Sequence, residues 1–260
     1  MSKSELIARM DADDRMKPER LKLQVEYLQE ITDIGLVSSK VVHIPQEGHD
    51  ARGYSSYITW MNEIKSFKEI STNRFIESPL AHPSVMFRKE LISLYGNYEN
   101  GNFPEDYELW LRLLDHGVKI GKVNACLLEW RDSPGRLSRI DSRYKLKAFQ
   151  VLKAKYVSRW LRKELPEGLN IHGWGAGEVA MQQITCLEEY GISLECIYDI
   201  NLKKTRAPNS LADVRHIEEI PKAGKIFLIV LIGAHGVRSK IVSFLSKRGY
   251  LPMKHYLLIA

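Results

Sequence analysis

The spacing of apolar residues in the first half of the chain predicts a series of short strands and helices. A short apolar stretch, Leu6–Met10, ends at an acidic cluster and predicts a strand that runs into a loop. Leu21, Val25 and Leu28 recur at helical spacing, which predicts a helix with Pro18 at its first position. By similar reasoning, we expect strands at residues 34–37, 82–87 and 123–130, helices at 57–67 and 104–117, and loops at 43–56, 97–104 and 131–143.

The pattern changes near Gly168, after which strands and helices alternate. The sequence LNIHGWGAGEVAMQQITCLEEYG predicts a strand, a glycine turn and a helix. Ile226–Ile232 is apolar on both faces, as the strands of a parallel sheet are. Such alternation is typical of a doubly wound α/β domain. We therefore expect an α/β protein with a Rossmann-like domain over residues 168–260 and a separate domain over residues 1–142.

A basic linker helix is expected between these domains, over residues 143–167. Its apolar side includes Phe149, Leu152, Tyr156 and Trp160, and lysines and arginines occupy much of the rest. One interpretation is an amphipathic helix that makes peripheral contact with a membrane surface. The other is a helix packed between domains, with its lysines in solvent. We favour the second, because an apolar stripe of this kind usually faces a protein core.

Composition and charge narrow the class of protein. Hydrophobic residues make up 44% of the 260 positions, enough for a buried core, yet no apolar run is long enough to span a bilayer. The first fifteen residues hold no signal-peptide core, and three cysteines without metal-ligand spacing indicate free thiols in a reducing, cytoplasmic setting. The net charge of +6 suits an anionic lipid, a phosphate-bearing substrate or nucleic acid. Nucleic acid ranks last, because no basic-aromatic binding motif is present.

The segment ARMDADDRM crowds three carboxylates, Asp11, Asp13 and Asp14, into four positions. An EF-hand loop is excluded, because the positions that require a further oxygen ligand, a glycine and a glutamate hold other residues. Acids before a helix N-terminus are a second explanation. A third is a divalent-cation site: in extended backbone, Asp11 and Asp13 point to the same side, and two hard oxygen donors suit Mg²⁺ or Mn²⁺.

A second acidic pair, Glu105 and Asp106, opens the predicted helix in PEDYELWLRLLDHG. The simplest explanation is compensation of the helix dipole in the first turn. The alternative is a general base that accepts the proton of an attacking hydroxyl while a metal ion stabilises a departing diphosphate. Together with the first acidic cluster, this pair indicates sugar transfer from a nucleotide donor.

Two stretches, LIARMDADDRMKPERLKLQVEYL and HPSVMFRKE…YGNYENGNFPEDYELWLRLLDHG, resemble the second half of family 2 glycosyltransferases. The resemblance covers residues 5–140, and with its tail domain the chain is similar to β-1,3-N-acetylglucosaminyltransferase-like proteins. It implies a GT-A nucleotide-diphospho-sugar transferase fold and a metal-dependent, inverting single displacement onto a glycan or other hydroxyl acceptor. By position, the resemblance implies roles for six residues: Asp11 and Asp13 as metal ligands, Asp106 as the base, Glu105 beside it near the acceptor, and His82 and Arg131 as substrate-binding residues.

Only ten residues precede Asp11, whereas the family places several strands and a nucleotide-binding loop ahead of this motif. We therefore expect an N-terminally truncated, incomplete GT-A domain. The strand that ends at Met10 is expected to lie at an unpaired sheet edge. These 260 residues are also expected to bind a nucleotide sugar poorly and to catalyse little.

The tail domain holds a G-x-G-x-x-A turn at Gly175 and Gly177, and Asp199 ends the next predicted strand. This is the Rossmann arrangement, in which the glycines admit a pyrophosphate and the acid takes ribose hydroxyls. Glu178 in the first helical turn would repel phosphate, so an NAD-like dinucleotide is possible but not favoured. Two alternatives to glycosyl transfer stay open: a dinucleotide-binding oxidoreductase and a non-enzymatic interaction module.

Overall fold

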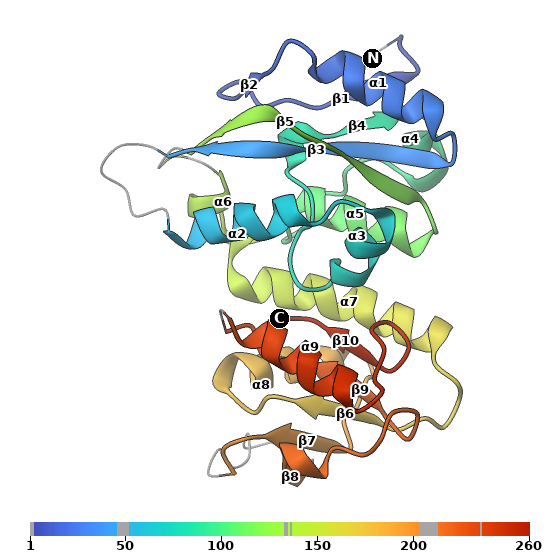
Figure 1. The fold of residues 1–260 in the computed structure, drawn as a ribbon, viewed down its shortest axis with the longest axis vertical. Coiled ribbons are helices and arrows are strands. Elements are labelled where there is room, and N and C mark those ends of the chain that lie inside the picture. Colours follow the sequence, from blue (N-terminus) through green and yellow to red (C-terminus); the bar gives the residue numbers. More distant parts are fainter. Residues whose placement is uncertain (1–2, 46–51, 133–134, 136, 203–212, 235) are drawn as a thin grey trace. The chain divides into compact units, whose positions relative to one another are not determined.

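The computed structural model describes residues 3–45, 52–132, 135, 137–202, 213–234 and 236–260 (Figure 1). The chain divides into two units. The first comprises residues 1–74 and 78–148, and the second comprises residues 75–77 and 149–260. The predicted division into domains at 142 and 167 stays a prediction.

The first unit is built on a mixed five-stranded sheet of order β1-β4-β3-β5-β2. Its strands are β1 (Leu6–Ala8), β2 (Arg15–Met16), β3 (Ile34–Ile44), β4 (Met86–Arg88) and β5 (Lys119–Arg131). The long central strands β3 and β5 are parallel, and the other neighbouring pairs are antiparallel. In the described part of the chain, β1 pairs only with β4 and lies at the sheet edge, the position expected for it.

The helices of the first unit cover both faces of this sheet. They are α1 (Arg20–Glu30), α2 (Arg52–Glu63), α3 (Phe67–Asn73), α4 (Glu90–Tyr95), α5 (Glu105–Asp115) and α6 (Leu137–Ile140), with 3₁₀ turns η1 (His82–Ser84) and η2 (Ser142–Tyr144). In Figure 1, α1 lies on one side of the sheet and α2 on the other. On the α1 side, Leu28 packs with Ile34, Val37 and Met86.

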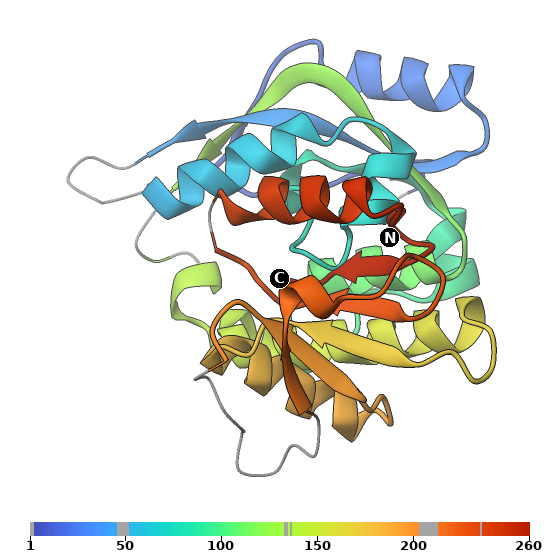
Figure 2. The same ribbon diagram turned by 60° about the horizontal axis from the view of Figure 1, so that its bottom comes forward.

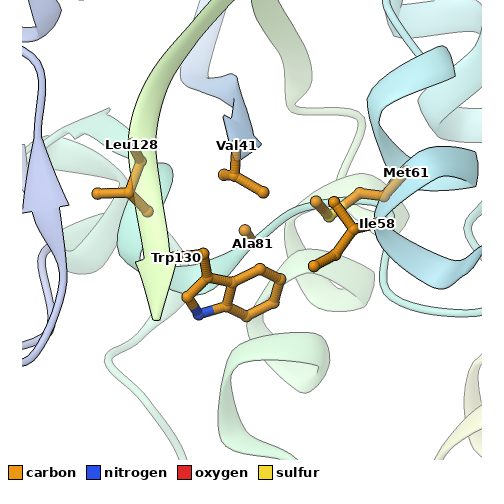
Figure 3. Close-up of a cluster of buried hydrophobic side chains, with 6 residues drawn as sticks. All are labelled: Val41, Ile58, Met61, Ala81, Leu128 and Trp130. Carbon is orange, nitrogen blue, oxygen red and sulfur yellow. The ribbon is translucent and has the colours of Figure 1, made fainter. Parts of the chain in front are cut away.

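The core on the α2 side joins the ends of the two long strands to the helix. Figure 3 shows its side chains: Val41 from β3, Leu128 and Trp130 from β5, Ile58 and Met61 from α2, and Ala81. Because successive strand residues point to opposite faces, Leu128 and Trp130 share the face that α2 covers. Burying a large aliphatic side chain in this way stabilises a fold by about 1.5–3 kcal/mol. This core holds α2 against the sheet, on the side opposite α1.

Several predicted boundaries in the first unit are wrong. Helix α1 begins at Arg20, two residues after Pro18. Strand β3 continues to Ile44 and α2 begins at Arg52, so part of the predicted loop at 43–56 is regular structure. The predicted strand at 82–87 is a 3₁₀ turn followed by β4, because Pro83 lacks the N–H that a strand ladder needs.

The second unit contains a parallel five-stranded sheet of order β10-β9-β6-β7-β8. Its strands are β6 (Ile171–Trp174), β7 (Cys196–Asp199), β8 (Asp213–His216), β9 (Phe227–Val230) and β10 (Tyr256–Leu258). Its helices are α7 (Leu146–Glu164), which begins in the first unit, α8 (Glu178–Glu189), α9 (Val237–Lys247) and the 3₁₀ turn η3 (Ile217–Glu219). Numbered along this unit, the strands run 5-4-1-2-3, which is the Rossmann order. The α/β class with a doubly wound second half is confirmed.

Helices cover both faces of the parallel sheet, which Figure 2 shows from a second direction. Trp160 of α7 packs against Phe227 of β9, and Trp174 of β6 packs against Phe244 of α9. Phe227 is paired with Ile171, three residues before Trp174, so these contacts lie on opposite faces of the sheet. The apolar strand residues are therefore buried on both sides, as the sequence pattern predicts.

The long basic helix α7 is mostly buried. Leu152, Tyr156 and Trp160 are all less than 8% exposed, so the helix does not present its apolar side to a lipid surface. Lys153 is also buried, and its Nζ donates to the carbonyl oxygens of Ile76 and Ile259. The prediction that the lysines of this helix are all solvated is wrong for Lys153. Among the described residues, no helix has the length and apolar composition needed to cross a membrane.

A second buried lysine, Lys122 of β5, gives a prediction about stability. Its Nζ donates to the carbonyl oxygens of Met61 and Pro79, and burial lowers the pKa of Lys122 from 10.5 to about 7. The unfolded chain therefore binds more protons than the folded chain between about pH 7 and pH 10.5, and stability from this group rises with pH over that window. Lys122→Met should remove this rise, so the difference in melting temperature between parent and variant should change by several degrees from pH 7 to pH 10.

The control for this measurement is Lys119→Met, which changes a half-exposed lysine of the same strand. Its melting curve should stay parallel to that of the parent chain across the pH range. Parallel curves for Lys122→Met would contradict the prediction.

Candidate functional site

The acidic segment after β1 forms a turn. The Asp14 N–H donates to the Asp11 carbonyl oxygen at 3.3 Å, so the backbone is not extended here. The argument that alternation places Asp11 and Asp13 on the same side is therefore wrong, and their sharing of one ion stays a prediction. Asp13 is exposed, whereas Asp14 is buried and its Oδ1 accepts the Arg131 N–H at 2.9 Å. Asp14 thus anchors the end of β5.

Arg9 lies next to the turn, and both its backbone N–H and its backbone carbonyl oxygen are hydrogen-bonded. Its N–H donates to the Val85 carbonyl oxygen at 2.9 Å, and its own carbonyl oxygen accepts from Arg20 Nη2 at 2.8 Å. Its side chain pairs with Asp11, with 2.6 Å between Arg9 Nη2 and Asp11 Oδ1. The sequence prediction did not include Arg9, because a basic residue at this position has no local signal that links it to a site.

A buried polar network joins this turn to the segment that carries His82. Arg20 and Gln24 of α1 are both fully buried. Arg20 donates through Nε to Gln24 Oε1 at 3.0 Å and through Nη2 to the carbonyl oxygens of Arg9 and Val85. Gln24 Nε2 donates to the Ser84 carbonyl oxygen at 2.8 Å. These bonds attach the acidic turn and η1 to the same side of α1.

His82 lies among aromatic side chains. Its Nε2 is 2.9 Å from the Tyr98 hydroxyl, and its ring makes an edge contact with the fully buried Trp110. Burial lowers the pKa of His82 below 6.5, although Asp106 acts in the opposite direction. The imidazole is therefore neutral near pH 7 and is suited to hydrogen bonding rather than to charge pairing. The loop 97–104 was predicted, but the contact of Tyr98 with His82 is long-range and was missed.

The loop that carries Tyr98 is fixed by a buried ion pair. Arg112 Nη2 lies 2.9 Å from Glu108 Oε2, and Glu108 is fully buried. The same guanidinium donates to the carbonyl oxygens of Tyr95 and Asn97. Residue 96 is a glycine with φ +89°, and a Cβ there would lie 2.8 Å from Arg112 Nη1. The helix α5 thus positions Tyr98 as well as the two acids at its own first turn.

Glu105 and Asp106 occupy different environments in the first turn of α5. Glu105 accepts from the Tyr144 hydroxyl at 3.1 and 3.2 Å and lies 3.4 Å from Arg143 Nη1. Asp106 Oδ1 accepts the Tyr107 N–H at 2.8 Å. Burial raises the pKa of Asp106 above 3.8, although His82 and the Tyr107 N–H act in the opposite direction. A carboxylate with a raised pKa is the stronger base, so Asp106 suits proton abstraction better than an ordinary aspartate does.

The charges that act on His82 show which predicted residues come together. Asp106, Arg9, Asp11 and Glu105 all influence the pKa of His82, and the same four residues influence Tyr98. Asp11 and Asp106, ninety-five positions apart in the sequence, therefore lie near the same imidazole. The backbone N–H of Arg131 is held by Asp14, and a substrate-binding role for its side chain stays a prediction.

The acidic turn offers oxygen donors of the kind that Mg²⁺ and Mn²⁺ prefer. Within the described ranges, no group of three or more histidine, cysteine, aspartate or glutamate side chains could hold a metal ion by itself. Mg²⁺ is commonly held by one or two carboxylates together with water and substrate phosphates, and Asp11 and Asp13 fit that pattern chemically. In this structure Arg9 is the counter-ion of Asp11.

In the second unit, the acidic residue that follows the glycine turn, Asp199, accepts hydrogen bonds from the protein backbone. Gly175 has φ +121°, and a Cβ there would lie 2.8 Å from Ile232 Cγ1, so the position requires glycine. Gly177 is the N-cap of α8, and nothing would lie within 4 Å of an added Cβ. Asp199 Oδ2 accepts the Ala176 N–H at 2.8 Å, and Oδ1 accepts the Asn201 N–H at 2.9 Å. The structure thus gives Asp199 a structural role, and dinucleotide binding stays a prediction.

Parts of this chain are similar to known glycosyltransferases. Residues 1–96 match the family described as Glycosyl transferase family 2. The chain is 31% identical over 133 residues to the O-antigen biosynthesis glycosyltransferase WbnJ of Escherichia coli, covering 50% of this chain and 48% of that protein. It is 30% identical over 129 residues to the UDP-Gal:alpha-D-GlcNAc-diphosphoundecaprenol beta-1,3-galactosyltransferase of Escherichia coli, covering 50% and 44%.

Among solved structures, the chain is similar to S. aureus TarS 1-349 in complex with UDP-GlcNAc. The TM-score is 0.46 at 13% sequence identity, covering 73% of this chain and 48% of that chain. The chain spans about half the length of the curated relatives that it matches.

Proposed function

We propose that this chain, whose residues 1–96 belong to glycosyltransferase family 2, transfers a sugar from a nucleotide-diphosphate sugar to a hydroxyl group of an acceptor. One observation carries the proposal: the charges of Asp11 and Asp106, which come from distant segments of the chain, both act on His82. Such a site combines Asp11, a carboxylate of the acidic turn, with Asp106, a carboxylate whose pKa is raised by burial.

The chemistry is a single displacement that inverts the anomeric carbon. The acceptor oxygen forms a bond to that carbon as the bond to the diphosphate oxygen breaks, and the hydroxyl proton passes to Asp106. Its raised pKa supports this role. Glu105, held by Tyr144 and Arg143, is oriented beside the base, where it suits a hydrogen bond to the acceptor. Neutral His82 suits a hydrogen bond to either substrate.

Asp11 and Asp13 are the residues that would hold Mn²⁺ or Mg²⁺. When bound, such an ion supplies positive charge that stabilises the departing diphosphate. With only two protein ligands, such an ion would take its other ligands from water and substrate phosphates, as is usual for Mg²⁺.

The donor and acceptor classes proposed for this chain are inferred from the names of two similar proteins. The galactosyltransferase named above uses UDP-Gal, and WbnJ is named for O-antigen biosynthesis. We therefore extend the proposal to a uridine diphosphate sugar as donor and a glycan as acceptor. The cytoplasmic setting stays a prediction.

Removing one carboxylate of the acidic turn tests the proposal. Asp13→Ala should weaken Mn²⁺-dependent binding of UDP at least about tenfold, because losing a ligand costs no less than losing its supporting contacts. Equilibrium dialysis with labelled UDP, with and without Mn²⁺, measures the effect. Asp33→Ala is the matched control, since it removes an aspartate that is half-exposed and pairs with Lys119. The proposal fails if the parent chain binds no UDP, or if Asp13→Ala behaves like the control.

A further inference from the structure

Arg9 combines a fixed backbone with a partly exposed side chain, whose guanidinium pairs with Asp11 and also donates to the Met10 carbonyl oxygen. The N–H and carbonyl oxygen of Arg9 are both hydrogen-bonded, to Val85 and to the fully buried Arg20. Its side chain is 36% exposed, and that of its partner Asp11 is 32% exposed. An ion pair exposed to this degree contributes only about 0–1 kcal/mol, so the guanidinium can leave Asp11 at small cost.

Carboxylates act on the same two side chains, His82 and Tyr98, as Arg9 does. Among the charges with the largest effects on His82 and Tyr98, Arg9 is the cation, and the other three are Asp11, Glu105 and Asp106. Of these three acids, Glu105 is paired with Arg143, and a nucleotide diphosphate that enters this site meets repulsion from the carboxylates of Asp11 and Asp106. It therefore needs cations, and a guanidinium is the side chain that best matches phosphate oxygens, through two parallel N–H donors.

We infer that Arg9 binds the diphosphate of the donor, exchanging its pairing with Asp11 for pairing with phosphate oxygens. Asp11 is thereby released to act as a metal ligand at the moment the donor arrives. Arg9 thus serves as the counter-ion of Asp11 before binding and as a diphosphate ligand afterwards. This inference rests on the proposed function and adds a substrate-binding residue that the sequence prediction lacked.

If Arg9 exchanges Asp11 for phosphate in this way, replacing Arg9 should raise the affinity for Mn²⁺ and lower the affinity for UDP. In Arg9→Gln, Asp11 no longer has a competing cation, so Mn²⁺ alone should bind about threefold more tightly, the change expected for a lost half-exposed ion pair. UDP at saturating Mn²⁺ should bind about tenfold more weakly, because a charge-assisted contact to phosphate is lost. Electron paramagnetic resonance measures free Mn²⁺, and equilibrium dialysis measures UDP. Arg9→Lys keeps a charge that can reach phosphate and should retain most of the UDP affinity.

Arg15→Gln is the matched control, since it removes the same charge from an exposed residue of the edge strand β2. It should change neither affinity by more than about twofold, as is usual for surface charges. If Arg9→Gln weakens both affinities, or behaves like Arg15→Gln while the parent chain binds both probes, the inference fails and the proposed function stands. If the parent chain binds neither Mn²⁺ nor UDP, the proposed function fails and the inference with it.

Discussion

Asp106→Asn should lower the rate of sugar transfer by about 10²–10⁴-fold, which is the usual contribution of a positioned general base. The amide keeps the size of the side chain and its oxygen still accepts the Tyr107 N–H, so the fold should not change. The base takes no part in binding the diphosphate, so the affinity for UDP in the presence of Mn²⁺ should stay within about twofold of the parent value. Single-turnover assays together with dialysis separate these two effects.

The pH dependence of the same reaction gives a second measurement of Asp106. The carboxylate acts as a base only when it is deprotonated, and burial raises its pKa above 3.8. The fall in rate on the acid side should therefore occur at a higher pH than an ordinary aspartate would give, and this fall should disappear in Asp106→Asn. Asp115→Asn, which makes the same change at the other end of α5, is the control and should keep both rate and profile. Equal rates for Asp106→Asn and the parent chain would show that another group takes the proton.

Arg20→Met should lower the free energy of unfolding by about 3 kcal/mol, because buried acceptors left without a donor cost about 1–3 kcal/mol each. The acceptors concerned are Gln24 Oε1 and the carbonyl oxygen of Arg9, whereas the Val85 carbonyl oxygen keeps the Arg9 N–H as a donor. Urea unfolding measures the change. Lys22→Met, on the same helix, replaces a side chain that is 75% exposed and should change stability by no more than about 0.5 kcal/mol.

The same variant should also weaken Mn²⁺ binding, because the acidic turn loses its attachment to α1. Arg20→Lys keeps the charge but lacks the planar donors, and it should be intermediate in stability. If Arg20→Met unfolds at the same urea concentration as Lys22→Met, the buried network does not support this site.

Much of the fold follows from local patterns. PEDYELWLRLLDHG predicts a helix over residues 104–117, and α5 runs from Glu105 to Asp115, because the apolar spacing and the terminal glycine agree. The apolar strands of the second half likewise predict a parallel sheet. The helical residues 52–56 were missed, since their sequence is mostly polar and the helix is stabilised by the core that contains Val41 and Trp130, against which Tyr54 packs. Tertiary packing decides such segments, and a local pattern does not contain it.

The candidate site was predicted only in part, for a related reason. The acidic residues are visible in the sequence because carboxylates cluster there. The conformation of the turn at Asp11–Asp14 was not predicted, because Asp14 is held by a hydrogen bond from the Arg131 N–H. Arg131 lies 117 positions away in the sequence. Arg9 and Tyr98 were missed for the same reason: their partners are fixed by sheet pairing and by the Arg112–Glu108 ion pair. Long-range contacts of this kind have no periodic signal.

The choice of arginine at position 20 affects how rate measurements on this protein can be interpreted. Burial lowers the pKa of Arg20 only to about 10, so its guanidinium stays protonated throughout the neutral range. A lysine shifted as far as Lys122, with a pKa of about 7, would lose its proton within that range. The charge of the scaffold beneath the acidic turn is thus constant over this range. A rate profile recorded between pH 5 and pH 8 therefore reports protonation of the reacting groups and not loosening of their support.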